Sequence, residues 1–357
     1  MQGKRSRTPS GWHPPAMGLL ALLAGIAPLT RAQTAGAPPG VPLAATQTSP
    51  TPAEPAPELP VAIIPNLGEA AEWYFSPDGE WLIGNAKREG DNAHRVYLAR
   101  RDGTEIRRIN DRGADACSFF FPDGRRIVWT STRDHPELPA GSYSDPNAYP
   151  QGAELYASDL HGGGVVRLTN NQVYDSEVSV SPDGKWILFT RQVDGKLDLW
   201  RMGPDGSGEE PITRTPEWQE GGAFYLPDSE TVIYRAWRIE DQAQRGMPMT
   251  IFTIRHDGTG LKRITHDPGT HWAPHPAPDG KHFAFVKLLS PRNFEIFVMS
   301  LETGEQRRLT HHEGFDGFPA FSPDGRSLAF ASSRDVAPGE RRLFTYVMDV
   351  ASLGFRP

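Results

Sequence analysis

A four-residue turn built on Pro-Asp recurs six times and constrains the fold of this chain more than any other feature. The six copies are Ser76–Gly79, Phe121–Gly124, Ser181–Gly184, Leu226–Ser229, Ala277–Gly280 and Ser322–Gly325. Their prolines are separated by 45, 60, 45, 51 and 45 residues, which indicates a base period of 45 with insertions of 15 and 6 residues. A fixed period of this length is typical of a tandem array of one supersecondary unit.

Each repeat contains the same succession of β-prone runs and turns. In the second repeat the turn is followed by the run Arg126–Thr130, the run Glu154–Ala157, a turn at His161-Gly162 and the run Arg167–Thr169. Proline presets φ, aspartate bonds to its own backbone and glycine supplies a positive φ, so Pro-Asp-Gly favours a tight turn. β-Branched and aromatic residues favour strands. The pattern therefore predicts four antiparallel strands in every repeat.

Six four-stranded units in tandem predict an all-β fold, a six-bladed β-propeller that spans about residues 61–350. The last repeat ends after its third strand, Leu343–Val347, whereas Val61–Ile64 precedes the first repeat and has no partner of its own. A blade with three strands would expose an open edge. We therefore expect the N-terminal run to supply the fourth strand of the sixth blade.

The first 32 residues have the pattern of a secretory signal peptide. Lys4, Arg5 and Arg7 precede the uncharged apolar run Met17–Leu29, and small residues before the end of the segment predict cleavage after Ala32. The apolar run has 13 residues, whereas a membrane-spanning helix needs about 20. We therefore expect no membrane span and a periplasmic or secreted protein.

Composition explains the next segment and excludes several classes of function. Residues 33–60 are rich in Ala, Pro and Thr, so they predict a disordered linker. A single cysteine, Cys117, excludes an intramolecular disulfide framework and an all-cysteine metal site. The formal net charge of −7 argues against a general nucleic-acid-binding protein, which needs a basic face.

The Ser-Pro-Asp-Gly turn, the aromatic strand after it, the Asp-Gly turn and the closing Arg-Leu-Thr strand resemble the WD-like repeats of the TolB-like family of six-bladed β-propellers. The resemblance covers about residues 61–350. It implies a periplasmic propeller that contacts proteins of the cell envelope. TolB carries an α/β domain ahead of its propeller, whereas the Pro/Ala-rich linker occupies that place here.

Both insertions fall between the second and third strands of a blade, at about residues 132–153 and 236–249. Because strand directions alternate, both rise on the same face, and long loops in compact repeats often carry function. On this face, the position seven residues before each turn proline should ring the mouth of the central channel. The residues at this position are Ala70, Asp115, Asp175, Glu220, His271 and Asp316.

Carboxylates and histidines at a channel mouth can bind a hard divalent cation. The candidate ligands for Ca²⁺, Mn²⁺ or Zn²⁺ are His271, His275, Asp175, Glu177 and Asp316. In the alternative interpretation the acidic residues are structural, because they accept backbone N–H bonds where the chain re-enters the sheet. They would also pair with the arginines that end the second strands, which are Arg133, Arg191, Arg235 and Arg334.

A second set of side chains is expected to face a ligand or partner. Its members are Asp115, Glu220, Tyr143, Tyr149, Trp218 and Trp272. Tyr143 and Tyr149 lie in the first insertion. Trp218 and Trp272 are placed in the loops that lead into the innermost strands, where an aromatic residue has little structural reason to occur.

The sequence favours an exported propeller that binds an envelope protein or a carbohydrate without catalysing a reaction. The alternative is a metal-assisted carbohydrate lyase or hydrolase, because the repeats also resemble the oligogalacturonate lyases, in which histidines hold a metal near the propeller centre. No complete catalytic set emerges, so no catalytic residue is assigned. The pattern specifies neither the ligand nor the oligomeric state.

Overall fold

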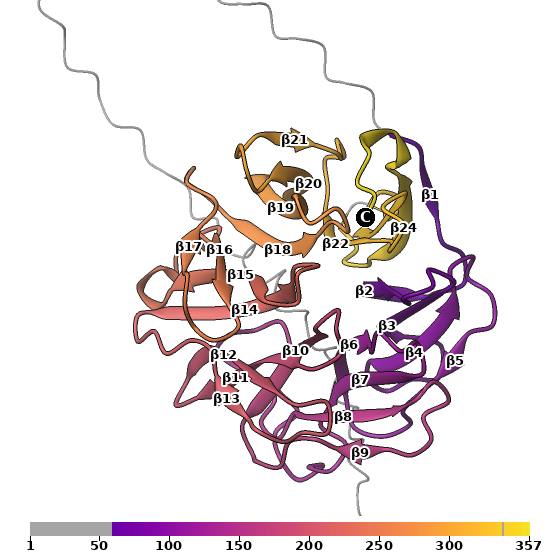
Figure 1. The fold of residues 1–357 in the computed structure, drawn as a ribbon. Coiled ribbons are helices and arrows are strands. Elements are labelled where there is room, and N and C mark those ends of the chain that lie inside the picture. The colour runs from indigo at the N-terminus through magenta and orange to yellow at the C-terminus, as the bar shows by residue number, and fades with distance from the viewer. Residues whose placement is uncertain (1–58, 338) are drawn as a thin grey trace, which may run out of the picture.

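A computed structural model of the chain describes residues 59–337 and 339–357. The predicted signal peptide and all but the last two residues of the predicted linker lie outside this range. Within it, the strands form six four-stranded antiparallel sheets around a central axis (Figure 1). The predicted all-β, six-bladed β-propeller is therefore confirmed.

The blades follow one another along the chain, each with its first strand innermost. Blades 1 and 2 comprise β2 (Glu69–Phe75), β3 (Trp81–Lys87), β4 (Arg95–Arg100), β5 (Arg107–Arg108), β6 (Asp115–Phe120), β7 (Arg126–Ser131), β8 (Glu154–Asp159) and β9 (Val166–Arg167). Blades 3 and 4 comprise β10 (Tyr174–Val180), β11 (Ile187–Val193), β12 (Lys196–Met202), β13 (Glu210–Pro211), β14 (Trp218–Tyr225), β15 (Thr231–Arg238), β16 (Thr250–Arg255) and β17 (Lys262–Arg263). Blades 5 and 6 comprise β18 (His271–Pro276), β19 (His282–Ser290), β20 (Asn293–Ser300), β21 (Gln306–Arg308), β22 (Asp316–Phe321), β23 (Ser327–Ser332), β24 (Phe344–Asp349) and β1 (Val61–Ile63).

Strand β1 closes the ring as the sequence predicts. It pairs antiparallel with β24, and Val61 lies opposite Met348. The pairing extends beyond the strand, because the Asp349 N–H donates to the carbonyl oxygen of Pro60 at 2.9 Å. Figure 1 shows the indigo strand β1 beside the yellow strand β24. The two ends of the propeller are thereby joined within one blade.

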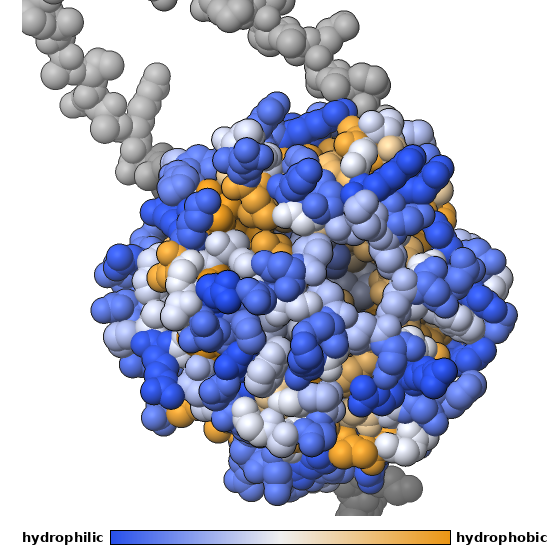
Figure 2. Space-filling view, viewed as in Figure 1, coloured by the Kyte–Doolittle hydropathy of each residue, from blue (hydrophilic) through white to orange (hydrophobic). Residues whose placement is uncertain are grey.

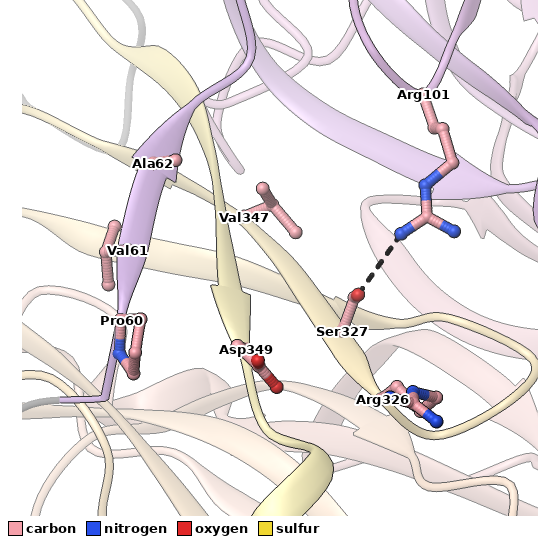
Figure 3. Close-up of a pocket in the computed structure, with 8 residues that line it drawn as sticks. All are labelled: Pro60, Val61, Ala62, Arg101, Arg326, Ser327, Val347 and Asp349. Atoms are coloured by element: carbon pink, nitrogen blue, oxygen red, sulfur yellow. Dashed lines mark hydrogen bonds between the residues drawn. The ribbon is translucent and has the colours of Figure 1, made fainter.

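The seam between the last and first blades needs a glycine. Gly103 has φ +81°, and a Cβ at this position would lie 2.0 Å from the carbonyl oxygen of Pro65. A small groove remains at this seam, lined by residues 60–62 and by Arg101, Arg326, Ser327, Val347 and Asp349 (Figure 3). Arg101 donates across it to the Ser327 hydroxyl at 3.3 Å. The closing strand and the first blade therefore contact each other directly.

The repeated threonine of the Arg-Leu-Thr run compensates for the short outer strands. Its hydroxyl accepts a backbone N–H from the third strand, as between Ile251 and Thr265 at 2.9 Å and between Ile296 and Thr310 at 2.9 Å. A buried backbone donor without a partner costs free energy. The threonine therefore satisfies donors beyond the two- or three-residue outer strand.

The hydrophobic core lies between adjacent blades. Phe121 and Val128 of blade 2 pack with Val180 and Ile187 of blade 3 in one buried cluster. The face seen in Figure 2 is mostly hydrophilic, with apolar residues in small separate patches. None of the helices among the described residues has the length and apolarity that crossing a membrane requires.

Every innermost strand carries a β-bulge near its start, where the register with the second strand shifts. The bulge includes the residue five positions before the turn proline. These residues are Glu72, Cys117, Glu177, Gly222, Ala273 and Phe318. In the last four of them φ is positive. A β-bulge changes the direction in which nearby side chains point, and these six bulges lie next to the propeller axis.

Candidate functional site

The six residues predicted to ring the channel mouth begin the innermost strands but are closed off from solvent. None of them is more than 3% exposed. The six residues are Ala70, Asp115, Asp175, Glu220, His271 and Asp316. These side chains therefore point into the protein where a loop enters the sheet, and not into open solvent at a mouth.

Three of the ring acids make the contacts of the structural alternative. Asp175 receives two hydrogen bonds from Arg191, each 2.7 Å long, in a bidentate pair. Asp316 pairs with Arg334 at 2.9 Å. Asp115 accepts the Val96 N–H of the preceding blade at 3.0 Å, and burial raises its pKa to about 6. We call such a buried acid with its partners a clasp.

Histidine replaces the clasp acid in blade 5. The His271 Nδ1 lies 3.2 Å from the carbonyl oxygen of Met249, and burial lowers the pKa of this histidine. The basic residue of the clasp is Lys287, whose Nζ instead lies 2.6 Å from Asp267 in the preceding loop. His271 therefore occupies a structural position with a compensating acid beside it.

The five candidate metal ligands are not brought together. Asp175 and Asp316 are held by arginines, His271 contacts a backbone carbonyl, and His275 lies deeper along the axis, where burial lowers its pKa to about 4. Across residues 59–337 and 339–357, no group of three or more His, Cys, Asp or Glu side chains could hold a metal ion. The geometry of the described residues therefore offers no assembled cation site.

The candidate aromatic residues lie in different surroundings from those expected. Trp218 and Trp272 belong to β14 and β18 and not to loops, because both innermost strands begin earlier than the sequence suggests. Trp272 is 6% exposed and packs edge to face on Phe318, with ring centroids 4.6 Å apart. Tyr143 is partly buried and donates its hydroxyl to the Ala114 carbonyl at 2.9 Å.

The two insertions meet. The first spans residues 132–153, and the second spans 239–249, because β15 continues to Arg238 where the sequence suggested an end before residue 236. The Gln242 side chain donates to Asn147 at 2.8 Å and so links them. Tyr149, 7% exposed, stacks on Tyr174 of blade 3 with centroids 4.3 Å apart. We call the two insertions the lid.

Aromatic side chains close the axis below the bulges. Tyr74 of blade 1 contacts Phe224 of blade 4 across the axis, with centroids 5.5 Å apart, and Phe119 of blade 2 at 5.3 Å. His275 of blade 5 lies 5.0 Å from Phe224. All four occupy the position three residues before the turn proline. We call this group the plug, because it closes the central channel at this level.

The bulge residues lie above the plug and form what we call the cup. Its best-defined contact is the ion pair between Glu177 of blade 3 and Arg235 of blade 4, at 2.6 Å. Glu177 also accepts the Thr190 hydroxyl at 3.0 Å and the Gly222 N–H at 2.8 Å. Glu177 therefore has a full set of donors.

Blade 4 makes room for this ion pair with a glycine. A Cβ on Gly221 would lie 2.1 Å from the Oε2 of Glu177 and 2.4 Å from a guanidinium nitrogen of Arg235. Real Cβ atoms do not approach other atoms this closely, so a side chain here would displace the pair. Gly221 therefore leaves the space that the Glu177–Arg235 ion pair of the cup occupies.

Glu72 is the second carboxylate of the cup, and it forms no salt bridge with any of the residues that the structure describes. It accepts the Tyr74 hydroxyl at 2.7 Å and lies 3.5 Å from the Cys117 thiol. Burial, and next the charge of Glu177, raise the pKa of Glu72. Its side chain is only partly buried.

The cup leaves one clasp incomplete. In blade 3 Arg191 lies opposite Asp175, but in blade 4 Ala236 lies opposite Glu220, and Arg235 faces the cup. Glu220 accepts the Thr215 hydroxyl at 2.6 Å, and its other oxygen has no hydrogen-bond partner within residues 59–337 and 339–357. Burial raises the pKa of Glu220 to about 7.

Comparison with known proteins finds similarity to TolB proteins and to an uncharacterized protein. The family model of the TolB beta-propeller domain matches residues 244–353. An uncharacterized protein of Agrobacterium fabrum is 27% identical over 218 residues, which is 60% of this chain and 68% of that protein. A TolB homologue of Chlorobium luteolum is 27% identical over 159 residues, which is 43% of this chain and only 33% of the homologue.

A solved structure shares the fold. The putative TolB from Agrobacterium tumefaciens superimposes with a TM-score of 0.56 and 23% identity, over 81% of this chain and 96% of that chain. An identity of this size supports the architecture and not a shared activity. Together with the six-bladed topology, these matches support a TolB-like six-bladed β-propeller.

Proposed function

We propose that this propeller is an exported, non-enzymatic binding protein of the cell envelope and that its ligand or partner contacts the lid. Export would follow from the predicted signal peptide, cleaved near Ala32. The observation that carries the proposal is the lid itself. Its two insertions are the interruptions of the 45-residue spacing, and they are joined through Gln242 and Asn147 over the blind cup.

Two further observations support this proposal. The relatives matched by the chain include proteins named for TolB. The long loops gather on one face, whereas the opposite face carries the short Pro-Asp-Gly and Asp-Gly turns. Scaffolds of this kind commonly place recognition on the loops of one face.

The proposal is tested by site-specific photo-crosslinking. A photoreactive residue replaces the exposed Ala148 in the lid, which leaves the Gln242–Asn147 contact intact, and a matched one replaces Asp205 in an exposed turn on the opposite face. After irradiation in the source organism, we expect a discrete adduct with an envelope component from the lid position alone. Adducts of equal yield from both positions, or none from the lid, would contradict the proposal.

The metal-assisted carbohydrate lyase or hydrolase remains the alternative, and no contact among the described residues favours it. It makes a different prediction for the purified protein. A divalent cation bound at about one per chain, and lost in a His271→Ala variant, would favour that enzyme over a binding protein.

A further inference from the structure

The loop that leads into blade 4, residues 213–217, is held by two acids at once. Thr215 in this loop donates its backbone N–H to Asp198 of β12 at 3.3 Å and its hydroxyl to Glu220 of β14 at 2.6 Å. Glu220 is 2% exposed, and Asp198 is half-buried. Two carboxyl groups from neighbouring blades therefore share one residue of the loop.

Glu220 has no cation beside it to compensate a negative charge. It forms no salt bridge with the residues that the structure describes, and Ala236 lies opposite it at the position where Arg191 completes the clasp of blade 3. Its Oε2 also lacks a hydrogen-bond partner among the same residues. An ionised carboxylate that is buried without a cation is unfavourable. The closed loop therefore favours the protonated form of Glu220.

The other titratable groups around Glu220 do not supply a cation. Burial, the largest cause, and the charge of Asp198 raise the pKa of Glu220 to about 7. Burial also raises the pKa of Asp198, in spite of the nearby charges of Lys196 and Arg214. On β15, burial and next the charge of Glu220 raise the pKa of the Tyr234 hydroxyl, which is therefore neutral.

The arginines on the strands packed against β14 each pair with another acid. The pairs are Arg191 with Asp175, Arg201 with Glu210, Arg235 with Glu177 and Arg238 with Glu240. On β18, which also packs against β14, His271 lies beside Asp267. Ionised Glu220 would therefore face Asp198 as a like charge in a region of low dielectric constant, where repulsion is strong.

The same loop holds the start of the second insertion of the lid. The Ile239 N–H, at the first residue of the short 3-10 helix η2 (Ile239–Asp241), donates to the Glu217 carbonyl oxygen at 3.0 Å. Next to it, the Arg238 guanidinium lies 5.1 Å from the centroid of the Trp218 ring. Residues 213–217 therefore contact the two acids through Thr215 and the lid through Glu217.

We propose that protonation of Glu220 controls whether the lid is held on the propeller. With Glu220 protonated, the loop keeps its contacts to both acids and to the second insertion. Once Glu220 is ionised, its repulsion from Asp198 opens the loop to water and releases the Ile239 N–H and the insertion. The inference rests on the proposed binding role of the lid and adds to it a regulation by pH.

The direction in which pH acts follows from the burial of Glu220. Its pKa is about 7 in the closed loop, and in an opened loop the carboxyl is hydrated and its pKa returns toward the usual 4.5. The closed loop therefore loses stability relative to the open one as pH rises from about 4.5 to 7. Between pH 5.5 and pH 8 the open fraction should increase on the order of tenfold.

Amide hydrogen exchange of the full chain at pH 5.5 and pH 8 tests the inference. Protection factors are compared, because they remove the intrinsic effect of pH on exchange. We expect the Ile239 amide to lose protection on the order of tenfold. The Leu226 amide, which donates to Thr231 at 2.7 Å at the other end of blade 4, should keep its protection. In Glu220→Gln the protection of Ile239 should be the same at both pH values.

Glu217→Gln is the matched control, because Glu217 has an exposed side chain of the same charge in the same loop and contacts the lid through its backbone carbonyl. This variant should lose Ile239 protection at pH 8 as the unaltered protein does. The inference is overturned if Ile239 in the unaltered protein is equally protected at both pH values, or if Glu220→Gln loses protection as well. It is also overturned if Leu226 loses protection equally, which would indicate unfolding of the whole blade.

The exchange measurement needs no partner, so its failure is distinguishable from failure of the proposed function. Equal protection of Ile239 at both pH values, together with persistent lid crosslinking, removes the regulation by pH and leaves the binding function. Absence of lid crosslinking contradicts the binding function itself.

Discussion

Blades 3 and 4 carry the same elements, yet they use their arginines differently. In blade 3 Arg191 lies opposite Asp175 and makes a bidentate clasp. In blade 4 Arg235 lies opposite Gly221 and pairs with Glu177 of the neighbouring blade. One arginine joins strands within its own blade, and the other helps to build a site on the axis.

A shift of one residue causes this difference. Arg191 is nine residues after its turn proline and Arg235 is eight residues after its own. Successive side chains of a strand point to opposite faces. Because of the shift, the Arg235 guanidinium lies in the cup, whereas the Arg191 guanidinium lies in a clasp, and the fold of the two blades is the same. The comparison shows that a repeat can acquire a site when one charged residue moves by one position along a strand.

The largest expected effect comes from breaking the complete clasp. Arg191→Ala leaves Asp175 buried, at 0% exposed, without its cation, which should lower the free energy of unfolding by about 3–5 kcal/mol. Urea unfolding measures it. Lys185→Ala is the control, because Lys185 pairs with Asp183 while 73% exposed, and such surface pairs contribute at most about 1 kcal/mol. Equal losses in both variants would show that the clasp is not structural.

A smaller loss is expected from filling the space beside the cup. The Cβ added by Gly221→Ala would collide with both members of the Glu177–Arg235 pair. Overpacking of this kind costs about 1–3 kcal/mol, again measured by urea unfolding. Gly203→Ala is the control, because its nearest neighbour, at 3.0 Å, is the flexible end of the Asp205 side chain. A Gly221→Ala protein as stable as its control would mean that the pair can relocate freely.

The smallest expected effect is an increase in the free energy of unfolding, and it depends on pH. The pKa of Glu220 is about 7 in the folded protein against a usual value of 4.5. The unfolded chain therefore releases this proton first, and the folded state loses stability as pH rises from about 4.5 to 7. Glu220→Gln should abolish that loss and stabilise the protein by about 1–2 kcal/mol at pH 8, less than the full shift implies because the amide N–H also needs a partner.

Thermal or urea unfolding of the Glu220→Gln protein at pH 4.5 and at pH 8 measures this difference. At pH 4.5 we expect little change, since the carboxyl is protonated in the folded state. Destabilisation at pH 8 would indicate that Glu220 is satisfied by charge contacts other than those described.

The fold could be predicted almost completely because its determinants are local. Pro-Asp-Gly turns, strand-forming runs and a fixed spacing each specify a short element, and counting the strands identifies Val61–Ile64 as the missing one. The ends of the strands and loops were predicted less accurately. Trp218 and Trp272 were expected in loops, and the second insertion was expected to begin at residue 236, because a strand extended by tertiary pairing has no local signal.

The site could be predicted only in part. Counting back from the turn prolines located Asp175 and Asp316, and the structural alternative correctly expected arginines of the second strands to pair with them. Arg235 was expected to pair with a ring acid, and its actual partner, Glu177, lies on another blade. Such pairings depend on which face of a strand a side chain occupies and on a bulge, neither of which has a signature in residue type. The same count taken two residues later gives Glu72, Cys117 and Glu177, and of these Glu177 was already among the candidate ligands.

The central claim, that the clasp stabilises the ring while the lid recognises a partner, is tested most directly by measuring the yield of the lid crosslink for the unaltered protein and for Asp175→Asn side by side. Both measurements are made at a temperature at which both proteins remain folded. The account predicts an unchanged crosslink yield for Asp175→Asn despite its lower stability. Loss of the crosslink in Asp175→Asn, or no crosslink from the unaltered protein, would contradict it.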